Sequence, residues 1–379
     1  MTEIESIQSK TVQWLRFILA ATVVLLHTTM KGYVDFVPLV EQPLSATIYR
    51  LFSWGLCTLA VPTFFLFSGY YFFTKLQEWD YGIYWDKLKK RAKTLLLPYV
   101  LWITIAFILS FTIGIITNWG GQISIISDFK DCLSEHGWLR IYWDNNRIGE
   151  NPERILNVIG VPMHHSNPFV SPLWFIRDLM VVMVLSPVVY VFVKYFKIWG
   201  LAIVAVLMSL NIWVPLEGFF APAFFFFVMG AFFQVHSRSF LLGFRKIEIP
   251  SYVLTIVFLA ASLLAYGHDY YLSEFFRKIF SIFGVISVVN ISGYLIEQDR
   301  VRIYSTLAAS SFFIYSTHTI CVSSLSSYIM SHVLPYNNTA AFIASYFMQA
   351  FLTVAICLGV FVVLKRICPH ILSVLTGGR

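Results

Sequence analysis

Residues 14–27 read WLRFILAATVVLLH, an apolar run with a basic residue near its start and a histidine at its end. Arg16 and His27 are eleven residues apart, so an α-helix places both side chains on one face, about 16 Å apart along its axis. Ionisable residues are costly inside a membrane and usually have a function there. The alternatives are an Arg16 side chain that snorkels to the headgroups and a His27 side chain that makes a helix-packing hydrogen bond.

The whole chain has the composition of a membrane protein. Of its 379 residues 58% are hydrophobic and 12% are charged, with a mean hydropathy of +0.72, whereas soluble domains carry about 25% charged residues. We expect an all-α polytopic membrane protein, with residues 1–379 forming one integral-membrane domain and no appended soluble domain. The net charge of +7 indicates topology and anionic lipids, not nucleic acid. The five scattered cysteines predict neither a metal site nor a disulfide framework.

Charge distribution predicts the orientation of the chain in the membrane. Segment 75–93 is rich in lysine and arginine, which places it in the cytoplasm by the positive-inside rule. Both termini are then cytoplasmic, Arg16 lies near the cytoplasmic face and His27 lies toward the far side. The long polar segment 118–170 is extracytoplasmic, either as a lid over a site or as a set of interfacial aromatic anchors. The ten predicted transmembrane helices are 11–30, 46–74 (bent), 94–117, 172–193, 198–214, 216–235, 249–267, 277–296, 306–330 and 340–364.

A basic cluster precedes the third predicted helix. Lys90, Arg91 and Lys93 offer point charges and a planar guanidinium fork, both of which suit phosphate groups. A cytoplasmic donor with several phosphates, such as coenzyme A, fits this chemistry. Topology and contact with lipid headgroups are the alternative role of the cluster.

Two further groups of polar residues lie within apolar runs. Arg177 and Asp178 are adjacent and leave a helix in different directions, so they need not pair with each other. Each then needs a partner elsewhere, such as a salt bridge to another helix, or an aqueous cavity. Tyr315 and His318 share a helix face, where a helix–helix hydrogen bond is the alternative to a functional role. Glu217 is a weaker candidate.

These motifs together resemble the membrane acyltransferase-3 family. The Arg16/His27 pair is similar to its arginine-x10-histidine motif, and residues 64–70, FFLFSGY, resemble its second-helix signature. Residues 89–93, followed by LPY at 97–99, resemble its basic motif, with Lys90 and Lys93 at the places of the commoner arginines. Residues 172–175 and 311–318 resemble later signatures. The matches run in order from residue 11 to about residue 320.

The resemblance implies an acyltransferase of the inner (cell) membrane. It would move an acyl group, usually acetyl, from cytoplasmic acyl-CoA to a hydroxyl of a carbohydrate or lipid-linked glycan at the extracytoplasmic side. His27 would be the general base or, alternatively, would be acylated itself, and Arg16 would orient the donor or stabilise negative charge. The other implied contacts are Lys90, Arg91, Lys93, Ser68 and Gly69 for acetyl-CoA, and Trp174, Arg177, Asp178, Tyr315 and His318 for the acceptor.

Two other classes of protein fit parts of the sequence. A secondary transporter that exports a sugar derivative would have broken helices in symmetry-related halves and would not turn over acyl-CoA. A membrane subunit or receptor would leave Arg16, His27 and the basic cluster without a joint role. Release of coenzyme A from acetyl-CoA distinguishes the enzyme from both.

Overall fold

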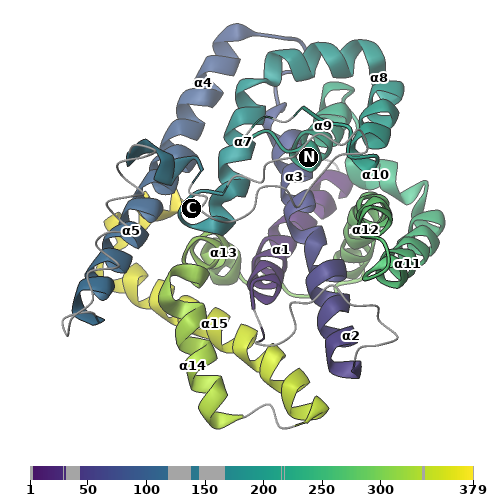
Figure 1. Ribbon diagram of the computed structural model, residues 1–379. Helices are drawn as coiled ribbons and strands as arrows, with labels where there is room; N and C mark the ends of the chain where they lie inside the picture. Colours follow the sequence, from purple (N-terminus) through teal and green to yellow (C-terminus); the bar gives the residue numbers. More distant parts are fainter. Residues whose placement is uncertain are drawn as a thin grey trace.

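The described part of the chain is built from helices, as the sequence predicted (Figure 1). The computed structural model describes residues 3–28, 30, 43–117, 138–144, 167–214, 216, 218–334 and 338–378, and no strand occurs among them. Most of the predicted loop 118–170 and Glu217 lie outside the described residues.

Seven helical segments of the described chain are long and apolar enough to cross a membrane. They are α1 (Glu3–Leu26), Leu44–Phe72, Tyr81–Ile116, α8 (Ser186–Ser209), α11 (Glu248–Ala265), α12 (Tyr270–Glu297) and α15 (Thr339–Ile367). The predicted spans at 216–235 and 306–330 contain shorter helices, namely α9 (Ala221–Val235), α13 (Ser305–Thr317) and α14 (Ser323–Val333). The structure therefore supports a multi-pass protein with seven clear candidate spans.

Helix α1 begins eight residues before the predicted first span. Its polar first turns are held in place because the buried Gln8 side chain accepts hydrogen bonds from the Ser239 hydroxyl at 2.7 Å and the Leu241 amide at 3.3 Å. Arg16 is thus thirteen residues, or about 20 Å, into the helix, so α1 extends well beyond the predicted span on the side of Arg16. His27 directly follows the last helical residue, with its amide still bonded to the Val23 carbonyl at 3.1 Å.

The predicted bend in the second span is confirmed. This segment consists of α2 (Leu44–Arg50), a π-helical turn η2 (Leu51–Gly55), a 3₁₀ turn η3 (Leu56–Leu59) and α3 (Ala60–Phe72). Gly55 lies at the junction of the two turns, with φ −103° and ψ −100°. Helices commonly kink at such π-helical turns.

Two other predicted boundaries differ from the structure. The basic segment that was expected as a loop contains α4 (Tyr81–Arg91), which continues through the π-turn η4 (Ala92–Leu96) into α5 (Leu97–Thr117). The predicted span at 306–330 is broken, because Ile320 and Cys321 in the turn η8 (His318–Val322) have non-helical dihedral angles. His318 therefore lies where α13 ends.

The remaining elements complete the bundle around α1. Helix α1 contacts α3, α12, α13 and α15, and Figure 1 shows it near the middle of the helices. Helices α11 and α12 form an antiparallel pair at one side, and α14 and α15 form another. The other described elements are α7 (Trp174–Val184), which precedes α8, the short helices α10 (Phe240–Arg245) and α16 (Pro369–Thr376), and the 3₁₀ turns η5 (Trp138–Tyr142) and η7 (Ser171–Leu173).

Candidate active site

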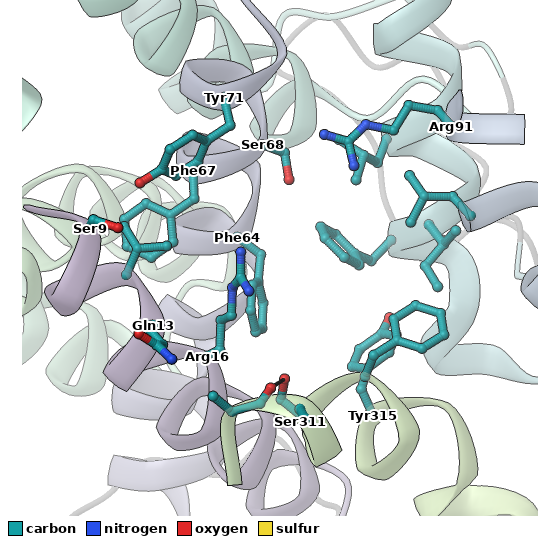
Figure 2. A pocket seen from close by; sticks show the side chains of 18 of the residues that line it. Ser9, Gln13, Arg16, Phe64, Phe67, Ser68, Tyr71, Arg91, Ser311 and Tyr315 are labelled. Atoms are coloured by element: carbon teal, nitrogen blue, oxygen red, sulfur yellow. Dashed lines mark hydrogen bonds between the residues drawn. The ribbon is translucent and has the colours of Figure 1, made fainter. Parts of the chain in front are cut away.

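A cavity of about 560 Å³ lies between α1, α3, α4, α7 and α13 (Figure 2). Its volume is in the range of small-molecule and cofactor sites. The lining residues are Ser9, Val12, Gln13 and Arg16 of α1, Phe64, Phe67, Ser68 and Tyr71 of α3, Arg91 and Leu95, Phe175, Ile176 and Leu179 of α7, and Ser305, Ala308, Ala309, Ser311, Phe312 and Tyr315 of α13.

Two guanidinium groups give this cavity its charge. Figure 2 shows Arg16 and Arg91 extending into the cavity from opposite sides, with the Ser68 and Tyr71 hydroxyls nearby. None of the described lining residues is an aspartate or glutamate. Because two like charges in one cavity repel each other, an anion between them would be stabilised. The remaining wall is largely aromatic and aliphatic, which suits a ligand with apolar parts.

The two intramembrane histidines lie against each other. The rings of His27 and His318 are 5.2 Å apart between centroids, in an edge-to-face arrangement with an interplanar angle of 61°. His27 Nδ1 lies 2.9 Å from the Val23 carbonyl, and His318 Nδ1 lies 2.8 Å from the Tyr315 carbonyl. A carbonyl can only accept, so in each neutral ring the proton is on Nδ1 and the lone pair is on Nε2. Both rings therefore offer Nε2 as a base.

His318 is the more enclosed of the two histidines. Its side chain is 0% exposed, and its buried Nε2 has no hydrogen-bond partner in the described part of the chain. The bonds at Nδ1 of both histidines are to carbonyls of their own helical segments, not across helices as the alternative explanation required. An unsatisfied buried nitrogen is uncommon and calls for a functional explanation.

Tyr315 connects the cavity to the histidine pair. Its ring lines the cavity and lies 6.3 Å from the His318 ring and 5.7 Å from the Phe175 ring, between centroids. Its hydroxyl donates a hydrogen bond to the Pro172 carbonyl. The order of neighbours is therefore the cation-lined cavity, Tyr315, His318 and His27.

The basic cluster divides into one residue that lines the cavity and two that do not. Arg91 is partly buried and lines the cavity, whereas Lys90 and Lys93 are exposed and are not among its lining residues. The sequence resemblance had placed Lys90 and Lys93 at the motif's arginine positions. The rotation of α4 about its axis decides which of the three side chains faces inward.

The adjacent residues Ser68 and Gly69 also face different neighbours. Ser68 lines the cavity, but Gly69 faces α9, where an added Cβ would lie 2.0 Å from the Phe227 carbonyl oxygen. Gly230 of α9 is equally close to α3, with the Leu66 carbonyl oxygen 2.0 Å from its added Cβ. Small residues allow two membrane helices to approach this closely. Gly69 therefore lies in a helix–helix interface and is not among the residues that line the cavity, and its contact with the donor stays a prediction.

Arg177 and Asp178 pair with each other, contrary to the expectation from their directions on a helix. Arg177 Nη2 and Nε donate to Asp178 Oδ1 at 2.8 and 2.9 Å, and both residues are buried. The flexible arginine side chain turns back to the nearest counter-charge, because an uncompensated charge is costly in this environment. Arg177 also donates to the Trp143 carbonyl and lies over its ring. Neither Arg177 nor Asp178 lines a described cavity.

Trp174 lies at a second, smaller cavity of about 140 Å³. This cavity is also lined by Leu26, the residue before His27. Trp174 and Phe175 thus face different cavities, although they are adjacent in α7. The predicted acceptor residues are consequently spread over three places: Tyr315 and His318 near the large cavity, Trp174 at the small one, and Arg177 with Asp178 in a buried ion pair.

Sequence reasoning missed several lining residues. Ser9 and Gln13 line the large cavity together with Arg16, and their spacing along α1 places them on the same helix face. This periodicity was a signal that could have found them. The same spacing relates Tyr71 to Ser68 in α3 and Ser311 to Tyr315 in α13. No group of three or more His, Cys, Asp and Glu side chains suited to a metal ion was found among the described residues.

The helices and the two-cation cavity define a polytopic membrane protein in which a contacting histidine pair lies near a cavity lined by two arginines. A family model described as an acyltransferase domain matches residues 10–364, and the chain belongs to this acyltransferase-3 family. It is therefore a membrane acyltransferase, as its motifs predicted, and the exporter and receptor alternatives are disfavoured. It is 24% identical over 335 residues to the succinoglycan biosynthesis protein ExoH of Rhizobium meliloti (strain 1021), covering 86% of this chain and 80% of that protein. No solved structure matches it.

Proposed function

We infer that this enzyme transfers an acetyl group from cytoplasmic acetyl-CoA to a hydroxyl of a glycan or lipid-linked sugar at the extracytoplasmic side of the cell (inner) membrane. The observation that carries this proposal is the order of neighbours from the Arg16/Arg91 cavity through Tyr315 and His318 to His27. Ten transmembrane helices with both termini in the cytoplasm fit this direction of transfer. In that topology the large cavity lies nearer the cytoplasm than His27 does.

The donor is expected in the large cavity. Arg91 and Arg16 both line it, and arginine binds phosphate oxygens through two parallel hydrogen bonds. Coenzyme A carries three phosphates, and its apolar and amide portions match the Phe64, Phe67 and Phe175 wall. Lys90 and Lys93, which are exposed, would attract the donor from solution without binding it in the cavity.

His27 is the proposed general base. Its Nε2 takes the proton of the acceptor hydroxyl while that oxygen attacks the thioester carbonyl carbon. The C–S bond then breaks, and the proton passes to the coenzyme A thiolate. Arg16 would orient the donor or stabilise the developing oxyanion. In the covalent alternative, His27 Nε2 attacks the thioester carbonyl carbon, the C–S bond breaks and coenzyme A leaves as the thiolate. The acceptor oxygen then attacks the resulting acyl-histidine, the C–N bond breaks, and the hydroxyl proton passes to the thiolate.

His318 and Tyr315 are proposed to position this base. His318 packs edge-to-face on His27, while Tyr315 is fixed by its hydrogen bond to Pro172. Arg177, which bonds to the Trp143 carbonyl and is paired with Asp178, is proposed together with Asp178 to shape the acceptor side without contacting the acceptor. The glycan class is supported by the ExoH relative, whose name assigns it to succinoglycan biosynthesis.

The test uses purified protein in detergent or lipid nanodiscs with acetyl-CoA and a panel of glycans. Thiol release is measured for the native protein and for His27→Ala. We expect acceptor-dependent release by the native protein and none above background by the variant. Absence of coenzyme A release with every glycan, from protein that binds acetyl-CoA, would contradict the proposed acceptor class.

A further inference from the structure

The small cavity is a candidate binding site that the transfer chemistry does not yet use. It lies at the end of α1, because Leu26 lines it, and Trp174 and Phe220 give it an aromatic wall. Its other notable lining residues are Arg277 and Lys278, from the first third of α12. Its volume of about 140 Å³ corresponds to only a few water molecules at about 30 Å³ each. It can therefore hold a small group of a larger ligand, but not a whole oligosaccharide.

Lys278 brings an uncompensated positive charge to this cavity. Its side chain is only 7% exposed. Lys278 lies eight residues, or about 12 Å, after the start of α12. Its ammonium donates to the Asn211 amide oxygen at 2.6 Å, and no carboxylate of the described chain lies within ion-pair distance. Buried lysines are rare unless they are paired with a counter-charge. A neutral amide orients the ammonium without neutralising it.

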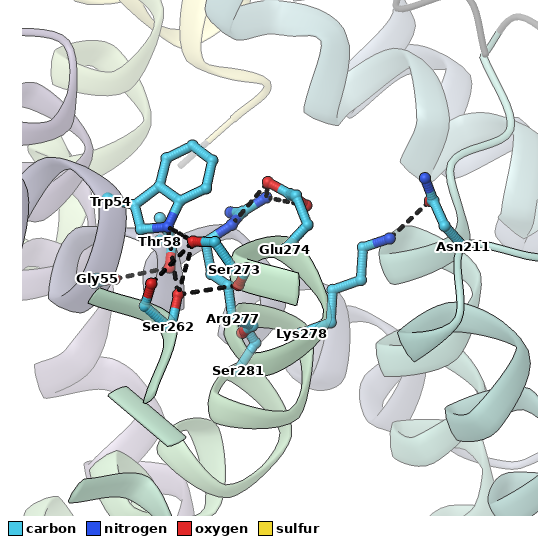
Figure 3. Close-up of polar contacts among 10 residues, drawn as sticks. All are labelled: Trp54, Gly55, Thr58, Asn211, Ser262, Ser273, Glu274, Arg277, Lys278 and Ser281. Carbon is cyan, nitrogen blue, oxygen red and sulfur yellow. Dashed lines mark hydrogen bonds and ion pairs between the residues drawn. The ribbon is translucent and has the colours of Figure 1, made fainter. Parts of the chain in front are cut away.

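The neighbouring charges do not remove this excess. Arg277 binds Glu274 through Nη2 at 2.6 and 2.8 Å and through Nε at 3.0 Å, and its guanidinium lies 4.7 Å from the Trp54 ring centroid. Figure 3 shows Arg277 and Lys278 leaving α12 in different directions, the first toward Trp54 and the second toward Asn211. Glu274 is thus engaged by Arg277, and the group of three carries a net charge of +1.

The position of the cavity relates it to the acyl-transfer step. Phe65 and Trp174 line the small cavity, while Phe64 and Phe175 line the large one, so adjacent residues of α3 and α7 face opposite sides of one aromatic layer. The Phe65 ring contacts both Trp174 and Phe175. Leu26, which lines the small cavity, directly precedes His27, so this cavity lies beside the end of α1 that carries the proposed base. A ligand in the small cavity would therefore lie across this aromatic layer from the donor cavity.

We propose that this cavity is an acceptor subsite in which Lys278 binds an anionic group of the acceptor, a phosphate or a carboxylate, while Trp174 packs against the sugar ring that carries it. This inference rests on the proposed function, since it assigns the acceptor's charge. A phosphate would come from a lipid-linked sugar, and a carboxylate from an acidic sugar of the glycan. The charge would hold the acceptor so that its hydroxyl meets His27.

The experiment compares three soluble probes: glucose 1-phosphate, glucuronic acid and the neutral methyl glucoside. Binding to the intact protein is measured by thermal stabilisation, without acetyl-CoA, and acetyl transfer is measured separately as thiol release. For the native protein we expect at least one anionic probe to bind about tenfold or more tightly than methyl glucoside, since hydrogen bonds to charged groups are the strong ones. Preference for glucose 1-phosphate or for glucuronic acid distinguishes the two sources of charge.

Two independent variants test Lys278, so the test does not fail if one of them does not fold. Lys278→Gln removes the charge, and Asn211→Asp keeps Lys278 but supplies a counter-charge at 2.6 Å; aspartate tolerates the positive φ of 58° at this position. Both should abolish the preference for the anionic probe, while Lys278→Arg should keep it. Lys246→Gln, the same change at an exposed lysine, is the matched control. An equal preference in all variants, or no preference in the native protein, would overturn the proposal, whereas anion binding without any acetyl transfer would count against the proposed function alone.

Discussion

The imidazole rings of His27 and His318, 291 positions apart in the chain, lie edge to face with their centroids 5.2 Å apart. Each ring is anchored through Nδ1 to a carbonyl of its own helical segment, three or four residues earlier. Two imidazole rings thus lie together near Tyr315 and the two-arginine cavity. The contact joins the end of α1 to the break between α13 and η8, so the irregular end of α13 has a place in the proposed chemistry.

The first prediction concerns His27 as the base. His27→Ala should lower acetyl transfer by about a hundredfold or more, the usual contribution of general acid–base catalysis, with coenzyme A affinity nearly unchanged. His236→Ala is the matched control, because His236 also follows a helix and bonds its Nδ1 to the carbonyl four residues earlier at 2.9 Å. Steady-state kinetics and coenzyme A binding are measured on the same preparations. Equal activity of both variants would show that the chemistry lies elsewhere.

The second prediction separates a positioning role of His318 from a catalytic one. His318→Phe keeps an aromatic ring against His27 but has no nitrogen, whereas His318→Ala leaves a void. If His318 acts by packing, the phenylalanine variant should retain most of the transfer rate and the alanine variant should lose it. The readouts are kcat, acceptor KM and thermal stability. Equal and complete loss of kcat in two folded variants would instead assign chemistry to the Nε2 of His318.

The third prediction concerns the donor phosphates. Arg91→Gln should weaken acetyl-CoA binding roughly tenfold to a hundredfold, since a hydrogen bond to a charged group is worth about 1.5–3 kcal/mol. Lys90→Gln and Lys93→Gln should change the affinity only slightly at physiological salt, because both lysines are exposed and salt screens exposed charges. Equilibrium binding at two salt concentrations provides the measurement. A larger effect of the two lysines than of Arg91 would reverse this assignment.

The fourth prediction tests the packing role of Gly69. Gly69→Ala should destabilise the protein by about 1–3 kcal/mol, the typical penalty of overpacking, because the new methyl group meets the backbone of Phe227. Gly359→Ala in α15 has nothing within 4 Å of its added Cβ and should be neutral or slightly stabilising. Thermal unfolding in detergent compares the two. A stable Gly69→Ala protein with weak acetyl-CoA binding would instead support the predicted contact of Gly69 with the donor.

The fifth prediction concerns orientation. A single cysteine at Leu139 in a cysteine-free protein should react with an impermeant thiol reagent added to intact cells, because the 118–170 segment is proposed to be extracytoplasmic. A cysteine at Lys246 should react only after lysis. Both positions are exposed. The reverse pattern would invert the proposed direction of acyl transfer.

Some features of this enzyme follow from the sequence alone. Hydropathy and the low charge content determine a helical membrane protein, since a chain in lipid must satisfy its backbone hydrogen bonds internally. The spacing of Arg16 and His27 predicts a shared helix face, and the same periodicity extends to Ser9 and Gln13. These properties are local, because helix geometry relates residues only to their near neighbours in the chain. The order of the motifs predicted the family to which the chain belongs, but it did not predict the contacts of each residue.

Tertiary structure decided which member of each adjacent pair faces the site. Ser68 lines the cavity while Gly69 meets α9, and Arg91 lines it while Lys90 does not. Sequence periodicity cannot predict which face of a helix points inward when most of its faces are apolar. Apolar side chains suit contact with lipid and contact with protein equally well. The contact between His27 and His318 and the bond between Lys278 and Asn211 likewise depend on how separate helices pack. Packing alone brings such distant residues together, since nothing in the local sequence relates them.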